Sequence, residues 1–140
     1  MISIVDDDPF VRQAINNLVR SLGYSAATFG SVEDFLQSSY IHETICLISD
    51  VQMPGLSGVD LQRVLIAQGN RMPMIFITAF FDERIRQSVM EAGAIGYLGK
   101  PFDDESLIEL LQWALQSEST SPSRRGAVAS RPAVPSRPWA

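Results

Sequence analysis

Short apolar runs alternate with longer amphipathic segments five times along this chain, and this alternation limits the folds that it can adopt. The apolar runs, which we expect to be strands, cover residues 2–5, 24–29, 45–48, 74–77 and 95–98. The segments after them repeat apolar residues at helical spacing, over 8–23, 31–38, 57–69, 82–92 and from 103 onward. Strands that alternate with helices form a parallel sheet covered on both faces. We therefore predict an α/β fold with a doubly wound, five-stranded parallel sheet.

Local residues indicate where these helices begin and end. Asp8 followed by Pro9 is typical of a helix start, because aspartate caps free backbone N–H groups and proline fits the first turn. Three further helix starts carry a capping residue: Ser31, Ser57 and Asp103. Three helices are predicted to end at a glycine: Gly23, Gly69 and Gly93.

Polar side chains stand where four of the five predicted strands end. They are Asp6, Asp7 and Asp8 after the first strand, Asp50 after the third, Thr78 after the fourth and Lys100 after the fifth. The carboxyl ends of parallel strands meet at one edge of a sheet, and sites in such folds form there. We therefore expect these side chains to converge, although each alone also has an ordinary role as a helix cap, a turn residue or a surface charge.

The converging groups predict phosphoryl chemistry. Two carboxylates about 4 Å apart repel by roughly 4 kcal/mol at an effective dielectric of 20, so the cluster needs a cation. Asp6, Asp7 and Asp50 offer hard oxygen ligands in an incomplete set, which suits Mg²⁺. Thr78 and Lys100, the one lysine of the chain, can bind phosphoryl oxygens. Asp50 is best placed to act as the nucleophile.

Composition excludes several other classes of protein. A single cysteine and a single histidine, Cys46 and His42, exclude a metal cage built from these residues. No apolar run approaches the ~20 residues of a membrane span, and no signal peptide precedes the first strand. We expect a cytoplasmic protein that does not bind membranes.

The charge of the chain is unevenly distributed. Residues 117–140 hold Glu118, four arginines and four of the eight prolines, for a net charge of +3. Because the whole chain carries −5, residues 1–116 carry −8, which argues against direct nucleic-acid binding by that part. We predict one domain over 1–116 and a flexible basic tail or linker over 117–140.

Four segments resemble the receiver domain of two-component response regulators: Ile4–Asp7, Ile48–Gly58, Ile75–Ala79 and Ala92–Phe102. The resemblance covers residues 1–116 and is nearest to nitrogen-fixation and nodulation regulators. It implies a flavodoxin-like (βα)5 fold with strand order 2-1-3-4-5. It also implies a stand-alone receiver or a piece of a longer regulator.

The resemblance assigns a phosphoacceptor and a metal site. Asp50 would accept a phosphoryl group from the phosphohistidine of a sensor histidine kinase or a histidine phosphotransfer protein. Mg²⁺ would be bound by Asp7 directly, by Asp6 mainly through water, by Asp50 and by the Gln52 backbone carbonyl. Such a chain is not an enzyme with turnover, and its chemistry is limited to self-phosphorylation and autodephosphorylation.

The resemblance also assigns switch and rate-modulating positions. Thr78 and Lys100 would bind the phosphoryl group, and Tyr97 matches an aromatic residue that turns inward on activation. Gln52 and Phe80 occupy positions that influence how water reaches the acyl phosphate. We hypothesise that the bulky, apolar Phe80 slows dephosphorylation.

A homodimer through the face formed by helix 82–92, strand 95–98 and the helix from 103 is a further expectation. Its candidate apolar contributors are Ile85, Val89, Leu98 and Trp113. Phosphorylation would switch this protein-interaction surface.

Two alternatives remain open. A haloacid-dehalogenase-like phosphatase also uses an aspartate nucleophile, and Asp6-x-Asp8 with the later pair Asp103 and Asp104 mimics its motifs. That pair lies only three and four residues after Lys100, and the chain has no room for a cap domain. The other alternative is a receiver-like module that binds proteins without being phosphorylated.

Overall fold

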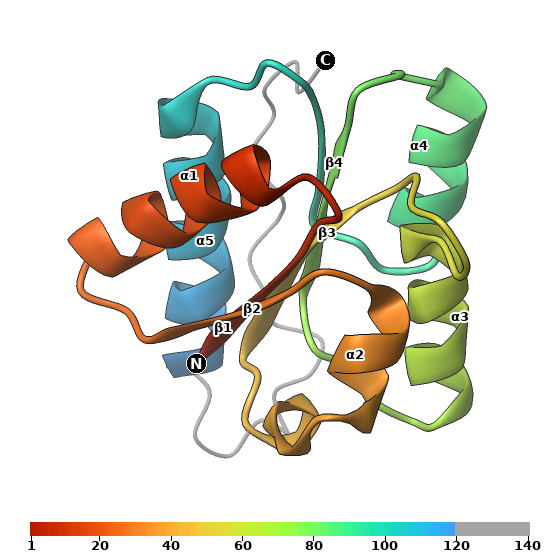
Figure 1. Ribbon diagram of the computed structural model, residues 1–140, viewed down its shortest axis with the longest axis horizontal. Coiled ribbons are helices and arrows are strands. Elements are labelled where there is room, and N and C mark those ends of the chain that lie inside the picture. The colour runs from red at the N-terminus through yellow and green to blue at the C-terminus, as the bar shows by residue number, and fades with distance from the viewer. Residues whose placement is uncertain (120–140) are drawn as a thin grey trace.

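A computed structural model describes residues 1–119 of the chain, which alternates strand and helix five times (Figure 1). The strands are β1 (Ile2–Val5), β2 (Ala26–Phe29), β3 (Cys46–Asp50), β4 (Met74–Thr78) and β5 (Gly96–Gly99). The helices are α1 (Pro9–Ser21), α2 (Val32–Gln37), α3 (Gly58–Ala67), α4 (Glu83–Glu91) and α5 (Asp104–Ser119). A short 3-10 helix, η1 (Ser39–His42), precedes β3.

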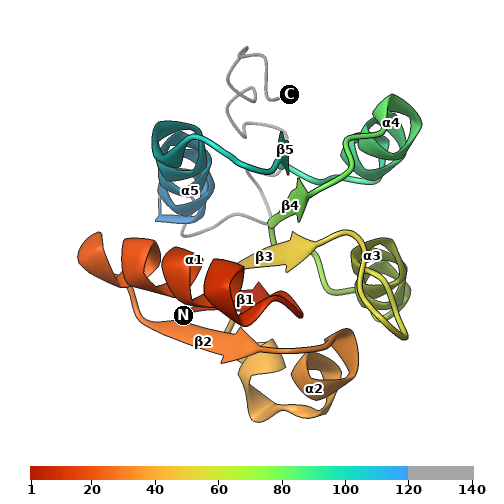
Figure 2. The same cartoon turned by 45° about the horizontal axis from the view of Figure 1, so that its top comes forward.

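The strands form one parallel sheet in the order β2-β1-β3-β4-β5. Helices α1 and α5 cover one face of this sheet, and α2, α3 and α4 cover the other (Figures 1 and 2). The predicted α/β class, the doubly wound sheet and the strand order are all confirmed. No helix within residues 1–119 is long and apolar enough to cross a membrane.

The two faces of the sheet carry separate apolar cores. Because successive strand residues point to opposite faces, Ile75 and Ile77 of β4 pack toward α1 and α5, whereas Phe76 packs toward α3 and α4. Every residue of β3 and β4 is buried, as expected for strands covered on both sides. Packing on both faces therefore fixes the positions of the residues at the ends of β3 and β4.

The predicted helix starts agree with the structure. The Asp8 carboxylate accepts a hydrogen bond of 2.9 Å from the Phe10 backbone N–H, so its capping role is confirmed. Ser57 and Asp60 form a reciprocal capping box, with hydrogen bonds of 3.1 and 2.9 Å. The Asp103 carboxylate accepts from the Glu105 N–H at 3.3 Å.

Several boundaries differ from the predicted ones. β2 begins at Ala26 rather than residue 24, and β3 and β4 continue through Asp50 and Thr78 instead of ending before them. The prediction ended each strand at its last apolar residue, whereas the ladder continues: Asp50 pairs with Ile77, and Thr78 pairs with Gly99. Asp50 and Thr78 are thus the last residues of β3 and β4, whereas Asp6 and Lys100 directly follow β1 and β5.

Two further differences concern the segments between strands and the end of the chain. The 3-10 helix η1 was not predicted, and its first turn has no side-chain capping bond that would mark it. α5 continues to Ser119, beyond the predicted limit of 116. The predicted tail over 117–140 lies outside the described residues from 120 onward.

Candidate functional site

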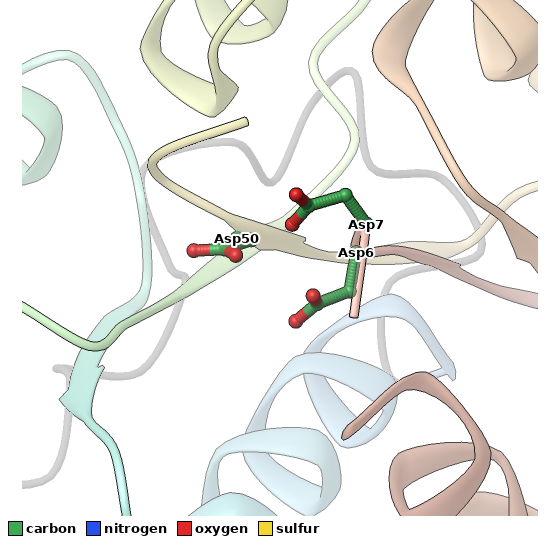
Figure 3. A group of neighbouring side chains, drawn as sticks. All are labelled: Asp6, Asp7 and Asp50. Atoms are coloured by element: carbon green, nitrogen blue, oxygen red, sulfur yellow. The ribbon is translucent and has the colours of Figure 1, made fainter. Parts of the chain in front are cut away.

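An acidic cluster stands at the carboxyl edge of the sheet. One carboxylate oxygen each from Asp6, Asp7 and Asp50 lies within 4.8 Å of the others, and Figure 3 shows Asp6 and Asp7 extending toward the side where Asp50 lies. The pairing of Val5 with Ser49 places the ends of β1 and β3 side by side. The side chains of Asp6 and Asp50 are buried, whereas that of Asp7 is exposed.

Lys100 bridges the two buried carboxylates. Its Nζ lies 3.2 Å from Asp6 Oδ2 and 3.3 Å from Asp50 Oδ2. The Lys100 backbone N–H donates to the Thr78 carbonyl at 2.7 Å, which ties the ends of β4 and β5 together. A cis peptide bond joins Lys100 to Pro101. The structure therefore brings together the carboxylates and the ammonium that the sequence placed at separate strand ends.

The electrostatics of this cluster favour an additional cation. Burial raises the pKa of the Asp50 carboxyl, and the neighbouring Asp6 raises it further, against the opposing effect of Lys100. Burial acts to lower the pKa of the Lys100 ammonium, but Asp6 and Asp50 outweigh it and raise that pKa. Three carboxylates face one ammonium, and their hard oxygen atoms are the donors that Mg²⁺ prefers. The residues present fit a Mg²⁺ site.

Backbone contacts fix the phosphoacceptor candidate, Asp50. Its Oδ1 accepts from the Gln52 N–H at 3.3 Å, and its carbonyl accepts from Ser49 Oγ at 2.9 Å. Gly58, the first residue of α3, lies against the same carbonyl, in space that a Cβ atom would fill. The side chain of Gln52 itself is exposed to solvent.

Asp6 is also held by its neighbours. Its Oδ1 accepts from the Asp8 N–H at 2.8 Å, and its backbone carbonyl accepts from Arg12 Nη1 at 2.7 Å. Roles for Arg12, Ser49 and Gly58 at the site were not predicted from the sequence. The one sequence signal for Ser49 is a serine just before an aspartate in an apolar strand, whereas Arg12 and Gly58 lie against backbone carbonyls, for which the sequence carries no signal.

Thr78 is fully buried at the end of β4, with its hydroxyl engaged by the loop that follows. Thr78 Oγ1 donates to the Phe80 carbonyl at 3.2 Å and accepts from the Phe80 N–H at 3.1 Å. The Phe80 side chain is 69% exposed, so it contributes little to the core. The loop after β4 therefore connects the hydroxyl directly to an exposed aromatic residue.

Tyr97 of β5 points inward and is only 1% exposed. Its ring meets Phe81 edge-on, with centroids 5.0 Å apart and planes at 82°. The hydroxyl lies near the Asp82 backbone and the Thr78 side chain but makes no hydrogen bond of ordinary geometry, and burial raises its pKa. Tyr97 thus occupies the inward position that the resemblance associates with activation.

Comparison with known proteins identifies the class to which this fold and this acidic site belong. Residues 2–112 match the response regulator receiver domain, and the chain belongs to this family of two-component systems. It is 37% identical over 118 residues to nodulation protein W of Bradyrhizobium diazoefficiens, covering 84% of this chain and 52% of that protein. It is 40% identical over 116 residues to response regulator protein TodT of Pseudomonas putida, covering 83% and 51%.

Solved structures give the same relationship. The response regulator StyR superposes with a TM-score of 0.81 at 36% identity, covering 92% of this chain and 65% of that one. FixJ-N superposes with a TM-score of 0.71 at 32% identity, covering 81% and 90%. The chain spans about half the length of the curated relatives it matches. The predicted membership of the receiver family is confirmed.

Proposed function

We propose that Asp50 accepts a phosphoryl group from the phosphohistidine of a sensor histidine kinase or a histidine phosphotransfer protein. The observation that carries this proposal is the bridge from Lys100 to Asp6 and Asp50 within a cluster of three carboxylates. A receiver that had become only a binding module would have no need to bury two carboxylates around one ammonium. We also propose that the protein acts in the cytoplasm.

In the proposed reaction, a carboxylate oxygen of Asp50 attacks the phosphorus atom of the phosphoimidazole. The O–P bond forms as the P–N bond breaks, and its electron pair returns to the imidazole nitrogen of the donor. The product is an acyl phosphate on Asp50. Water later attacks the phosphorus, releases inorganic phosphate and restores the carboxylate, so the chain acts as a phosphoacceptor rather than as an enzyme with turnover.

The neighbouring residues would stabilise the transferred group. Asp6, Asp7, Asp50 and the Gln52 carbonyl would hold Mg²⁺, which would neutralise charge on the transferring oxygens. The Lys100 ammonium would then exchange one of its carboxylate partners for a phosphoryl oxygen.

Phosphorylation is proposed to act through Thr78 and Tyr97. The Thr78 hydroxyl would leave the Phe80 carbonyl and donate to the phosphoryl group instead, which shifts the loop after β4. The face of α4, β5 and α5 would then change its affinity for a second copy or another protein. Val89 and Leu98 are core residues, so such a face would use the half-buried Ile85 rather than these two.

The phosphatase alternative is less well supported. Asp103, which would belong to its closing acidic pair, caps α5 through Glu105 and Ser106 instead. Turnover of a small phosphomonoester would nevertheless favour that alternative over the proposed function.

Intact-mass analysis after incubation with acetyl phosphate or phosphoramidate tests the proposal. A Mg²⁺-dependent increase of about 80 Da, one phosphoryl group, is expected for the wild type and not for Asp50→Asn. A parallel titration with beryllofluoride covers the case of a very short phosphoryl lifetime. Absence of both the adduct and Mg²⁺-dependent beryllofluoride binding, beside a control receiver that is labelled, would contradict the proposal and favour the binding module.

A further inference from the structure

The loop between β3 and α3 contacts a carboxylate from another helix. Glu33 Oε2 of α2 accepts a hydrogen bond of 3.2 Å from the Leu56 backbone N–H, between residues 23 positions apart. The same oxygen lies where a Cβ atom on Gly55 would come within 2.7 Å, so a side chain there would displace the carboxylate. Gly55 also has a φ of +80°, which glycine adopts without strain. The loop is thus shaped to receive Glu33.

This contact holds the middle of a loop whose two ends are held locally. Near β3, the Gln52 N–H donates to Asp50 Oδ1, and at the other end Ser57 forms the capping box of α3. Within residues 1–119, the Glu33–Leu56 bond is the hydrogen bond that joins the segment between these ends to a different helix. The loop backbone is therefore tied to α2 through this hydrogen bond, in addition to the packing of its Met53 and Leu56 side chains against the core.

Helix α2 is itself firmly placed, so it can act as a fixed support. Its Val32 and Phe35 are fully buried in the core beneath the sheet. Phe35 also packs edge-on against Phe29 at the end of β2, with ring centroids 5.3 Å apart. Glu33 lies between the buried Val32 and Phe35 in the sequence, so the backbone that carries its side chain is held by the core.

We propose that Glu33 is a positioning residue for the Mg²⁺ site: by holding the Leu56 N–H, it fixes the loop that carries the Gln52 carbonyl. The inference rests on the proposed function, because it concerns the affinity of the same metal site. Glu33 contacts neither the metal position nor Asp50, so it acts only through the backbone of the loop. Supporting groups of this kind tune metal affinity by orienting the ligands.

Three variants of the full chain separate this effect from a change of charge. Glu33→Ala removes the acceptor, whereas Glu33→Gln keeps an acceptor oxygen and removes the charge. Asp34→Asn is the matched control, since it removes a neighbouring charge on the same helical turn, where the carboxylate is exposed. Mg²⁺ dissociation constants are measured by titration calorimetry, Leu56 amide exchange by NMR, and stability by urea unfolding.

Glu33→Ala is expected to weaken Mg²⁺ binding by about 3- to 10-fold and to speed exchange of the Leu56 amide. Glu33→Gln should retain most of the affinity, and Asp34→Asn should match the wild type. Equal Mg²⁺ affinity in Glu33→Ala and Asp34→Asn would overturn the inference. So would an equal loss in Glu33→Gln and Glu33→Ala, because charge alone would then explain it.

Failure of the proposed function gives a different result. If the wild type binds no Mg²⁺, the metal site itself is absent, and both the proposed function and this inference are overturned. If the wild type binds Mg²⁺ and Glu33→Ala binds it equally well, only the inference fails.

Discussion

Lys100 Nζ and Asp50 Oδ2 lie 3.3 Å apart, although 50 positions separate these residues in the chain. Asp50 ends β3 and Lys100 follows β5, so the whole of β4 lies between the two supporting strands. The contact therefore depends on correct pairing of three neighbouring strands. The buried Asp50 carboxylate thus has Lys100 as its cationic partner, and it shares that ammonium with Asp6.

Removal of the Lys100 charge is expected to destabilise the protein. Lys100→Met leaves two buried carboxylates without their cation, so the free energy of unfolding at neutral pH without Mg²⁺ should fall by about 1–3 kcal/mol. Urea unfolding measures this difference. Arg84→Met is the control, because its ion pair is 3.9 Å long with a side chain 93% exposed, and it should leave stability unchanged. An unchanged midpoint for Lys100→Met would mean that the bridge contributes nothing net to folding.

The buried Tyr97 hydroxyl predicts a pH dependence with a defined sign. Burial raises the pKa of Tyr97 above its ordinary 10.0, so the folded state holds this proton more tightly than the unfolded chain does. The resulting stability is present below pH 10.0 and is lost as the pH rises toward the folded-state pKa. As the pH rises above 10.0, the free energy of unfolding should therefore fall less for Tyr97→Phe than for the wild type. Urea unfolding at several pH values measures this difference.

The same substitution makes a second prediction at neutral pH. A buried hydroxyl without a hydrogen bond costs free energy, so Tyr97→Phe should be as stable as the wild type or more stable by up to about 1 kcal/mol. Tyr40→Phe, at a residue 39% exposed, is the control and should change little. A clear loss of stability in Tyr97→Phe would show that the hydroxyl makes a favourable contact in solution.

Gly58 is predicted to be sterically required. A Cβ atom in Gly58→Ala would meet the Asp50 carbonyl and come within 2.9 Å of Ser49 Oγ. We expect a loss of about 1–3 kcal/mol in the free energy of unfolding, with reduced labelling of Asp50 by acetyl phosphate. Gly30→Ala is the matched control, because a Cβ atom there would meet Arg12 Nη1 at an ordinary contact distance of 3.4 Å and no backbone atom. Equal thermal midpoints for the two variants would contradict this account.

Phe80 is predicted to lengthen the life of the acyl phosphate. Phe80→Ala should shorten it by about two- to tenfold, because water would reach the phosphoryl group more easily. The side chain is 69% exposed, so stability should be little affected and the lifetime can be interpreted directly. The lifetime is followed by the decay of the phosphorylated mass after removal of the donor. An unchanged lifetime would refute the hypothesis.

The fold was predictable because its signals are local and repeated. Apolar runs predicted the strands, and residues such as Asp8 and Ser57 predicted helix starts that their hydrogen bonds confirm. The strand ends were less predictable, because apolar character stops before the hydrogen-bonded ladder does. Asp50 and Thr78 are polar, yet both pair with neighbouring strands.

The site was predictable where its residues stand at strand ends and follow the rule for parallel sheets. Its supports were not, because Arg12 and Glu33 bind backbone groups outside their own helices. Every residue has a backbone carbonyl and nearly every one an N–H, so the sequence does not indicate which of them a side chain will bind. Such contacts can be identified only from the three-dimensional structure.

The tie between the Lys100 N–H and the Thr78 carbonyl has a consequence for biosynthesis. A ribosome delivers Asp6, Asp7 and Asp50 before the lysine, so if β1 pairs with β3 during synthesis, these carboxylates meet without Lys100 until β5 docks beside β4. Before that point, a bound cation such as Mg²⁺ would have to supply the positive charge that Lys100 later provides. Lys100 would thus reach Asp6 and Asp50 only after the fifth strand has joined the sheet.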